Sequence, residues 1–297
     1  MTDTPPLTIA ILGTGALGTL MAWHWRHQCL YVYNRRQTTN FCLHSTSPES
    51  FQAPAWHGEA TDWLVVTTKA ADTASALESV ESYLPAVKRL LLLQNGMGQQ
   101  EQIRDWLQRR HTDAHNMPEL WVASSTEGAY RREDGTVVYA GKGITRAGPW
   151  CSEAANAQTL LPPQITYADN IQQLLLEKLA INAVINPLTA YYSCHNGELL
   201  NHPERHRHFE ALAEEITDLY SGLGWATSFS IPEQAEVVAR ATAKNQSSTF
   251  QDMLHQRPTE LPYICGYLLS EAQKKNLKAP LTQELYQSLS AMEAAWH

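Results

Sequence analysis

Several features that would place a chain in a special structural class are missing here. The five cysteines are an odd number, lie far apart and form no CxxC pair, which argues against a disulfide framework or a zinc site. No apolar run approaches the roughly 20 residues that span a bilayer. The first residues, MTDTPPLTIAILG, contain no basic segment ahead of the first apolar run, so no signal peptide is expected. Together these absences predict a cytoplasmic protein without a membrane partner.

Positive charge is also scarce. Lysine and arginine number 22 against 30 acidic residues, giving a net charge of -8. Such a surface repels nucleic acid unless a strong basic patch exists, and RHR at residues 205–207 is too short to be one. We therefore expect no nucleic-acid partner, and any anionic ligand must be bound by local features.

Three histidines close together raise the question of a metal site. His202 and His206 are four residues apart but straddle Pro203, and neither they nor His208 come with a recognisable further ligand. A solvated helix start explains them better, so no metal is predicted.

A glycine fingerprint follows the first apolar run. Residues 7–12, LTIAIL, have the length of a strand, and a helical pattern starts immediately after the fingerprint, which is the context that makes GxGxxG informative. The fingerprint consists of Gly13, Thr14, Gly15, Ala16, Leu17 and Gly18. Its glycines would allow a tight turn, the approach of a pyrophosphate and close helix packing. The alternative is a glycine-rich turn that binds nothing.

The residues after the second predicted strand, 30–33, favour NADPH over NADH. An NAD site usually has an acidic residue about 20 positions beyond the fingerprint, whereas an arginine accommodates a 2′-phosphate. Here Asn34 is followed by Arg35 and Arg36, and we favour Arg35 as the phosphate ligand. The alternative is a pair of solvated surface arginines.

Further strands are expected at 61–68, 88–93 and 120–124, with helices after the first two. Lys69 and Asn95 would then lie at the carboxyl edge of the sheet, where open α/β sheets bind ligands. Residues 136–148 suggest antiparallel hairpins that close the sheet. The expected architecture is α/β: a Rossmann-type dinucleotide-binding domain at 1–168, followed by an all-α domain at 169–297.

A narrow polar stripe stands out in the helical half. Lys178, Asn182 and Asn186 are four residues apart, so they share one face of a helix that is otherwise apolar. A lysine buried without a partner is costly. Two explanations remain open: a polar network that ties helices together, or a cleft-facing acid with amide assistants. Pro187 should kink or stop the helix beside Asn186, which favours the second.

The remaining helices are expected at 169–190, with Asp169 as N-cap, and at 203–223, 232–244, 260–275 and 281–295. Residues 245–260, NQSSTFQDMLHQRPTE, look too polar and broken for the core. Their serines and Glu260 could face the same cleft as Lys178.

In chain order, several segments resemble those of the ketopantoate reductase (2-dehydropantoate 2-reductase) family. They are GTGALG, NRR, the lysine after VVTT, LLLQNGMG, EKLAINAVINPLTAYYSCHNGEL and SSTFQDMLHQRPTEL. The resemblance covers most of the chain and implies a helical domain of the 6-phosphogluconate-dehydrogenase-like type. Residues 36–60 match no clear pattern, and 99–125 is longer than is usual in the family.

The resemblance also implies roles for individual residues. Contacts with NADPH are implied for Gly13, Thr14, Gly15, Ala16, Leu17, Gly18, Arg35, Lys69, Asn95, Ala129 and Glu260. Contacts with substrate are implied for Asn95, Lys178, Asn182, Asn186, Asn196 and Ser248. Lys178 would be the proton donor, and Glu260 would close the site against either ligand.

The reaction so implied is NADPH-dependent reduction of ketopantoate to pantoate in pantothenate biosynthesis. Its partner would be a small 2-oxo acid, bound with domain closure by a monomer or homodimer. Two alternatives stay open: reduction of another 2-oxo acid, and a non-catalytic protein that senses NADPH.

Overall fold

The computed structural model describes residues 6–33, 38–110, 117–150 and 160–296. The chain divides into two compact units. The N-terminal unit comprises Met1–Asn95 and Gln99–Ile171, and the helical unit comprises Gly96–Gly98 and Gln172–His297. The division after Ile171 lies a few residues beyond the boundary expected from the sequence.

A seven-stranded sheet forms the centre of the N-terminal unit, in the order β11-β10-β7-β6-β5-β1-β2. Its parallel strands are β1 (Thr8–Leu12), β2 (Cys29–Tyr33), β5 (Thr61–Val66), β6 (Val87–Leu92) and β7 (Glu119–Ser125). The antiparallel extension is β10 (Thr145–Pro149) with β11 (Ile165–Tyr167). Strand order reverses between β1 and β5, which creates a topological switch point at that edge of the sheet. The predicted α/β fold with a Rossmann-type sheet is confirmed.

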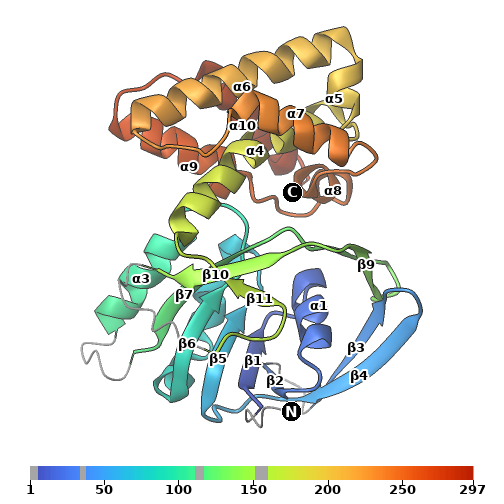
Figure 1. Ribbon diagram of the computed structural model, residues 1–297, viewed down its shortest axis with the longest axis vertical. Coiled ribbons are helices and arrows are strands. Elements are labelled where there is room, and N and C mark those ends of the chain that lie inside the picture. The colour runs from blue at the N-terminus through green and yellow to red at the C-terminus, as the bar shows by residue number, and fades with distance from the viewer. Residues whose placement is uncertain (1–5, 34–37, 111–116, 151–159, 297) are drawn as a thin grey trace. The chain divides into compact units, whose positions relative to one another are not determined.

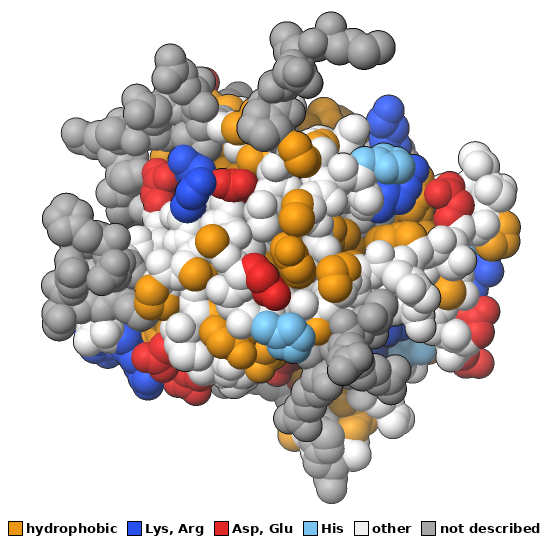
Figure 2. All heavy atoms as spheres, turned by 90° about the horizontal axis from the view of Figure 1, so that it is seen from below, with side chains coloured by type: hydrophobic (Ala, Val, Ile, Leu, Met, Phe, Trp, Pro, Cys, Tyr) orange, Lys and Arg blue, Asp and Glu red, His pale blue; other side chains and the backbone are white. Residues whose placement is uncertain are grey.

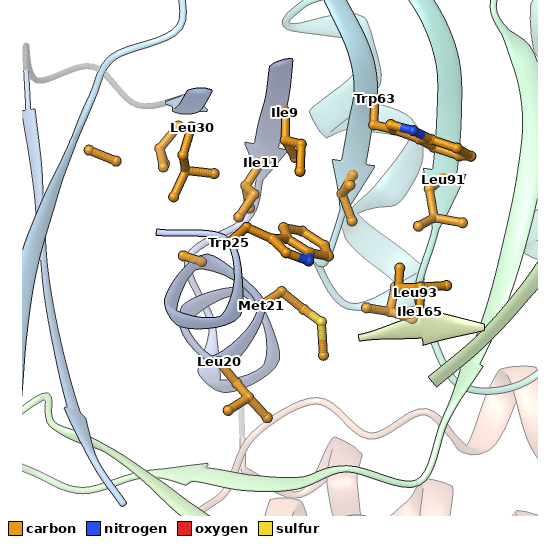
Figure 3. Close-up of a cluster of buried hydrophobic side chains, with 14 of the residues drawn as sticks. Ile9, Ile11, Leu20, Met21, Trp25, Leu30, Trp63, Leu91, Leu93 and Ile165 are labelled. Carbon is orange, nitrogen blue, oxygen red and sulfur yellow. The ribbon is translucent and has the colours of Figure 1, made fainter. Parts of the chain in front are cut away.

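Large aromatic side chains fill the core of this unit. Trp25, the C-cap residue of α1 (Ala16–His24), is fully buried, and so is Trp63 of β5. Figure 3 shows both among aliphatic side chains. Trp63 meets Trp121 edge to face at 5.2 Å between ring centroids. Trp63 Nε1 donates to Leu160 O at 3.1 Å, whereas the buried Trp121 Nε1 has no acceptor among the described residues.

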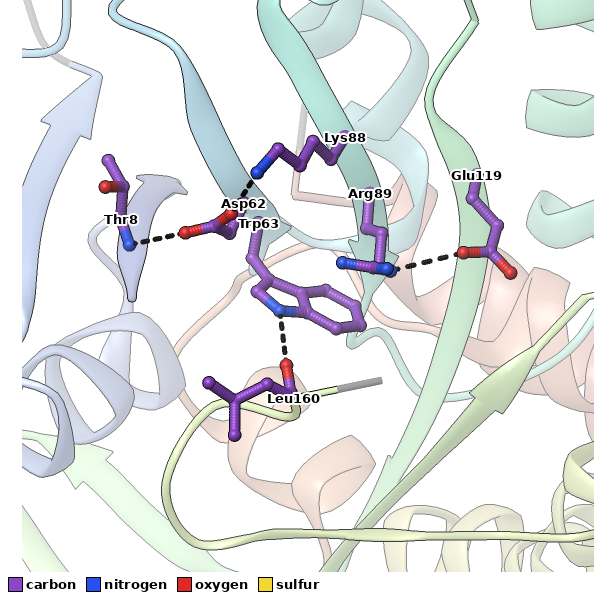
Figure 4. A network of polar contacts seen from close by, with 7 residues as sticks. All are labelled: Thr8, Asp62, Trp63, Lys88, Arg89, Glu119 and Leu160. Atoms are coloured by element: carbon purple, nitrogen blue, oxygen red, sulfur yellow. Dashed lines mark hydrogen bonds and ion pairs between the residues drawn. The ribbon is translucent and has the colours of Figure 1, made fainter. Parts of the chain in front are cut away.

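Charged side chains connect the amino ends of the central strands. Asp62 accepts from Thr8 N at 2.9 Å and from Lys88 Nζ at 2.8 Å, so it joins three strands (Figure 4). Beside it, the Arg89 guanidinium lies over the Trp63 ring and pairs with Glu119 at 3.2 Å. These contacts hold the strand order at the edge opposite the glycine fingerprint.

The structure adds a second sheet that the sequence did not predict. Its four strands, in the order β4-β3-β9-β8, are β3 (Thr38–His44), β4 (Pro48–Pro54), β8 (Gly128–Arg131) and β9 (Val137–Gly141). The expected closing hairpins are therefore only partly right, because β10 joins the main sheet while β8 and β9 pair here. Phe41 and Phe51 stack at 4.9 Å across the β3–β4 hairpin, and α1 is packed between the two sheets.

The helical segments of the N-terminal unit are short. The helix α3 (Gln99–Arg110) forms as predicted, whereas the pattern after Lys69 breaks into a 3-10 turn (Ala70–Asp72), α2 (Thr73–Glu78) and a further 3-10 segment (Glu81–Ala86). Pro85 lies inside that last segment and prevents a regular continuation.

The helical unit contains all five predicted helices and two short ones. They are α4 (Ile171–Tyr192), α5 (Glu198–Asn201), α6 (Pro203–Leu223), α7 (Ile231–Ala241), α8 (Ser248–Leu254), α9 (Leu261–Lys274) and α10 (Pro280–Ala294). The prediction that 245–260 is too broken for the core is wrong, because α8 buries Thr249, Phe250 and Asp252.

Two expectations for α4 are corrected. The helix begins at Ile171, so Asp169 is not its N-cap. Of the kink or stop expected at Pro187, the stop does not occur, because the helix continues to Tyr192, close to the end expected at residue 190. Residues 183–190 are all buried, and this packing outweighs the local cost of the missing proline N–H.

The surface carries polar, charged and hydrophobic side chains. Figure 2 shows one face on which hydrophobic side chains form separate spots among polar ones, with charges of both signs around them. Within the described ranges, no helix is both long and apolar enough to cross a membrane.

Candidate functional site

The glycine fingerprint forms a tight connection between β1 and α1. Gly13 has φ +111°, and a Cβ there would lie 2.7 Å from Thr68 N. A Cβ at Gly18 would lie 2.1 Å from Gly13 O and 2.5 Å from Thr67 Oγ1. Both positions require glycine, since any larger residue would displace backbone.

Gly15 serves a different purpose, because no described residue crowds it. It is exposed, and a Cβ built on it meets no atom of the described residues within 4 Å. It is also the N-cap of α1, where no side chain caps the first turn. Open backbone at a helix N-terminus suits an anion, so this loop fits the pyrophosphate of a dinucleotide.

Two side chains that the sequence analysis missed hold this loop. Thr67 Oγ1 donates to Gly13 O at 2.6 Å, and Arg131 on β8 donates to Thr14 O. The threonine could have been found as the first polar residue after the apolar strand β5. Nothing in the sequence pattern brings Arg131 to Thr14, since they are far apart in the chain.

The other cofactor candidates of this unit occupy three places. Lys69 and Asn95 follow β5 and β6 at the same carboxyl edge as the fingerprint, as expected. Ala129 is half-buried on β8 of the second sheet. Arg35 and Arg36 lie outside the described residues.

In the helical unit, α4 carries the predicted polar stripe. Lys178 and Asn182 are half-buried, and Asn186 is buried. Burial lowers the pKa of Lys178 to about 8, against the opposing effect of the Glu260 carboxylate, which raises it. An amine with such a pKa can give up a proton near neutral pH and recover it.

Glu260 is the N-cap residue directly before α9, so the helix begins one residue later than the expected start at 260. The loop in front of it is fixed from α10, because Glu293 accepts from Thr259 N at 3.2 Å and from Thr259 Oγ1 at 2.7 Å. This fixes the backbone next to the carboxylate that acts on Lys178.

Asn196 and Ser248 lie on segments that are bonded to their neighbours. Asn196 is buried, and its backbone N–H donates to Asn245 O at 3.0 Å. Ser248 is exposed, whereas the preceding Ser247 is buried. Ser247 Oγ caps α8 by accepting a hydrogen bond from Phe250 N at 3.0 Å, and it accepts another from Thr189 Oγ1 at 2.7 Å. Since Thr189 is one turn beyond Asn186, these bonds connect the Ser248 segment to α4.

The candidates thus form two groups. The glycine loop, Lys69, Asn95 and Ala129 belong to the N-terminal unit, whereas Lys178, Asn182, Asn186, Asn196, Ser248 and Glu260 belong to the helical unit. In the described part of the chain, no group of three or more His, Cys, Asp or Glu side chains could hold a metal ion. His208 instead bonds through Nδ1 to Tyr192 OH at 3.0 Å.

A Rossmann-type sheet with a glycine loop at its switch point, followed by a helical unit with a lysine of lowered pKa, is the architecture of a dinucleotide-dependent oxidoreductase. Comparisons with known proteins narrow this class. Residues 9–152 match the family described as "Ketopantoate reductase PanE/ApbA", and residues 170–293 match "Ketopantoate reductase PanE/ApbA C terminal". The 2-dehydropantoate 2-reductase of Vibrio cholerae is 32% identical over 302 residues, covering 98% of this chain and 99% of the relative. The chain belongs to the ketopantoate reductase family.

Solved structures agree with this fold. The probable 2-dehydropantoate 2-reductase of Bacillus subtilis has a TM-score of 0.77 at 29% identity and covers 96% of this chain and 99% of its own. A D-mandelate dehydrogenase, solved with NADH and anilino(oxo)acetate, has a TM-score of 0.82 at 17% identity, with 97% and 98% covered. At that identity the second likeness shows the fold alone.

Proposed function

We propose that the protein reduces 2-dehydropantoate (ketopantoate) to pantoate with NADPH, a step of pantothenate biosynthesis. The observation that carries the proposal is Lys178 on α4, with a pKa lowered to about 8 and two amides on the same face, in a chain of this family.

On the cofactor side, a bound NADPH supplies the hydride for the ketone carbon. The loop of Gly13, Thr14, Gly15, Ala16, Leu17 and Gly18 would hold the pyrophosphate with backbone N–H groups and the α1 N-terminus. Arg35 would bind the 2′-phosphate through its guanidinium fork, which suits phosphate geometry. Lys69, Asn95 and Ala129 would complete the binding of the dinucleotide.

On the substrate side, Lys178 would act as the general acid. As the ketone oxygen gains negative charge, the ammonium group stabilises it through a hydrogen bond and then donates its proton. Glu260 favours the protonated amine before each turnover, because its carboxylate raises the pKa of Lys178. The lysine is then reprotonated from solvent.

The amides and the serine would fix the orientation of the substrate. Asn95, Asn182, Asn186 and Asn196 can both donate and accept, and Ser248 can donate to a carboxylate. Such orientation can lower a barrier by several kcal/mol.

The test is to follow NADPH absorbance with ketopantoate and with other 2-oxo acids, and to identify pantoate as the product. Lys178→Ala should abolish reduction while leaving NADPH binding, measured by titration, nearly unchanged. Lys278→Ala, a lysine exposed on the loop before α10, is the matched control and should keep full activity.

Three results would each contradict a different part of the proposal. Near-normal turnover by Lys178→Ala would exclude it as the acid. A strong preference for another 2-oxo acid would change the substrate, and NADPH binding without any reduction would indicate a sensing protein. The proposal includes a monomeric or homodimeric state in the cytoplasm, and size-exclusion chromatography tests the state.

A further inference from the structure

Asn196 is held by its side-chain nitrogen. Its Nδ2 donates to Thr242 Oγ1 at 2.8 Å, and Thr242 is the C-cap residue of α7. The residue is only 7% exposed, so its amide has little access to water. The orientation of this amide therefore depends on Thr242.

The direction of these hydrogen bonds is fixed by Thr242. Its Oγ1 donates to Val238 O at 2.7 Å, one turn earlier in α7. A hydroxyl has one proton, so an oxygen that donates to Val238 can only accept from Asn196. The amide nitrogen of Asn196 is consequently turned toward Thr242 and its oxygen away from it.

The side-chain oxygen of Asn196, Oδ1, is one of several buried polar atoms without a hydrogen-bond partner in the described part of the chain. A buried acceptor without a donor costs free energy, which a bound donor would recover. The atom therefore calls for a ligand group that carries a proton.

We propose that Thr242 is a positioning residue that presents the oxygen of Asn196 to the substrate and thereby selects 2-oxo acids that carry a hydroxyl group. This inference rests on the proposed function. At neutral pH the carboxylate and the ketone of ketopantoate can only accept hydrogen bonds, so its hydroxyl is the one group that can donate to Asn196.

The experiment compares ketopantoate with 3,3-dimethyl-2-oxobutanoate, which has the same skeleton without the hydroxyl. Thr242→Val keeps the shape and the backbone bond from its N–H to Val238 O, but it removes the acceptor for the amide. We expect kcat/KM for ketopantoate to fall about tenfold, mainly through KM, with little change for the analogue. Thr242→Ser should restore the wild-type preference.

Thr217→Val is the matched control. Thr217 Oγ1 makes the same bond to a carbonyl four residues earlier, Ala213 O at 2.8 Å, but on α6 and with no asparagine bonded to it in the described structure. Its loss should leave the preference unchanged. If Thr242→Val does not fold, Thr242→Ala provides the same comparison.

The outcomes separate this inference from the function on which it rests. If the wild type reduces neither compound, the proposed function fails and the inference fails with it. If the wild type reduces ketopantoate but Thr242→Val lowers both substrates equally, or neither, Thr242 does not set the preference and only the inference is overturned.

Discussion

Lys178 is a residue at which stability and activity should oppose each other. Its pKa is lowered from 10.5 to about 8 by burial, so below pH 8 the folded protein bears the full cost of a charged buried amine. Lys178→Met should therefore raise the free energy of unfolding at pH 7 by about 1 to 3 kcal/mol while abolishing reduction. Urea denaturation followed by circular dichroism measures the gain.

The pH dependence provides the check on this cause. Between pH 8 and 10.5 the folded amine loses its proton while the unfolded amine keeps it, so wild-type stability rises with pH in that window. The advantage of Lys178→Met should shrink accordingly. Lys278→Met, at an exposed position, should show neither effect, and an advantage that does not change with pH would point to packing instead of charge.

Glu260 should set the pH at which activity is lost. An acid must be protonated, so kcat should fall as the pH rises through about 8, the pKa of Lys178. The Glu260 carboxylate raises that pKa, and Glu260→Gln should shift the fall in kcat to lower pH. A pH–rate profile at saturating substrate measures this, and an unchanged or higher midpoint would show that Glu260 does not act on the donor.

For single residues, the sequence allowed a prediction only where the spacing between residues places them on the same face of an element. The position of Lys178, Asn182 and Asn186 on one face of α4 could be predicted, because residues four apart share a helix face. Thr242 and Arg131 could not, because each acts on a residue distant in the chain, Asn196 and Thr14 respectively. Such pairs depend on tertiary packing, for which a single sequence contains no local pattern.

Among the elements, α8 and the β3–β4 hairpin were not predicted, for different reasons. Residues 245–260 are rich in polar residues, but several of these are buried with partners: Thr189 donates to Ser247, and Asp252 pairs with Arg257 at 3.1 Å. The hairpin buries Phe41 and Leu43 on one face only, in strands whose other residues are mostly polar. The parallel strands β1, β5 and β6 were predicted correctly because each ends in an uninterrupted apolar run.

The two serines at the start of α8 should respond to mutation in different ways. Ser247→Ala removes the N-cap bond from Phe250 N and the bond with Thr189, so it should lower stability by about 1 to 2 kcal/mol. Because these bonds fix the segment of Ser248, KM for the substrate should also rise. Ser248→Ala, at an exposed position, should raise KM without loss of stability. Thermal unfolding and steady-state kinetics measure both, and equal stability losses would contradict the distinction.

For the whole molecule, the two units differ in what they contain. The N-terminal unit holds seven of the nine tryptophans, at positions 23, 25, 56, 63, 106, 121 and 150, whereas the helical unit holds Trp225 and Trp296. The short segment Gly96–Gly98 belongs to the helical unit although it lies within the N-terminal part of the chain. Its Met97 N donates a hydrogen bond to Tyr263 O of α9 at 2.8 Å. Tryptophan fluorescence therefore reports mainly on the N-terminal unit.

This distribution allows cofactor binding to be tested without catalysis. NADPH at about one hundred times its Kd should stabilise the unit that binds it by roughly 2.7 kcal/mol, so the fluorescence-detected unfolding midpoint should rise. Lys178→Met should keep that rise, because its side chain belongs to the helical unit. Gly15→Ala should fold normally, since its Cβ meets no atom of the described residues within 4 Å. It should nevertheless lose most of the rise, because the methyl group obstructs the approach of the pyrophosphate. A rise of equal size in Gly15→Ala would show that the dinucleotide binds elsewhere than at the glycine loop.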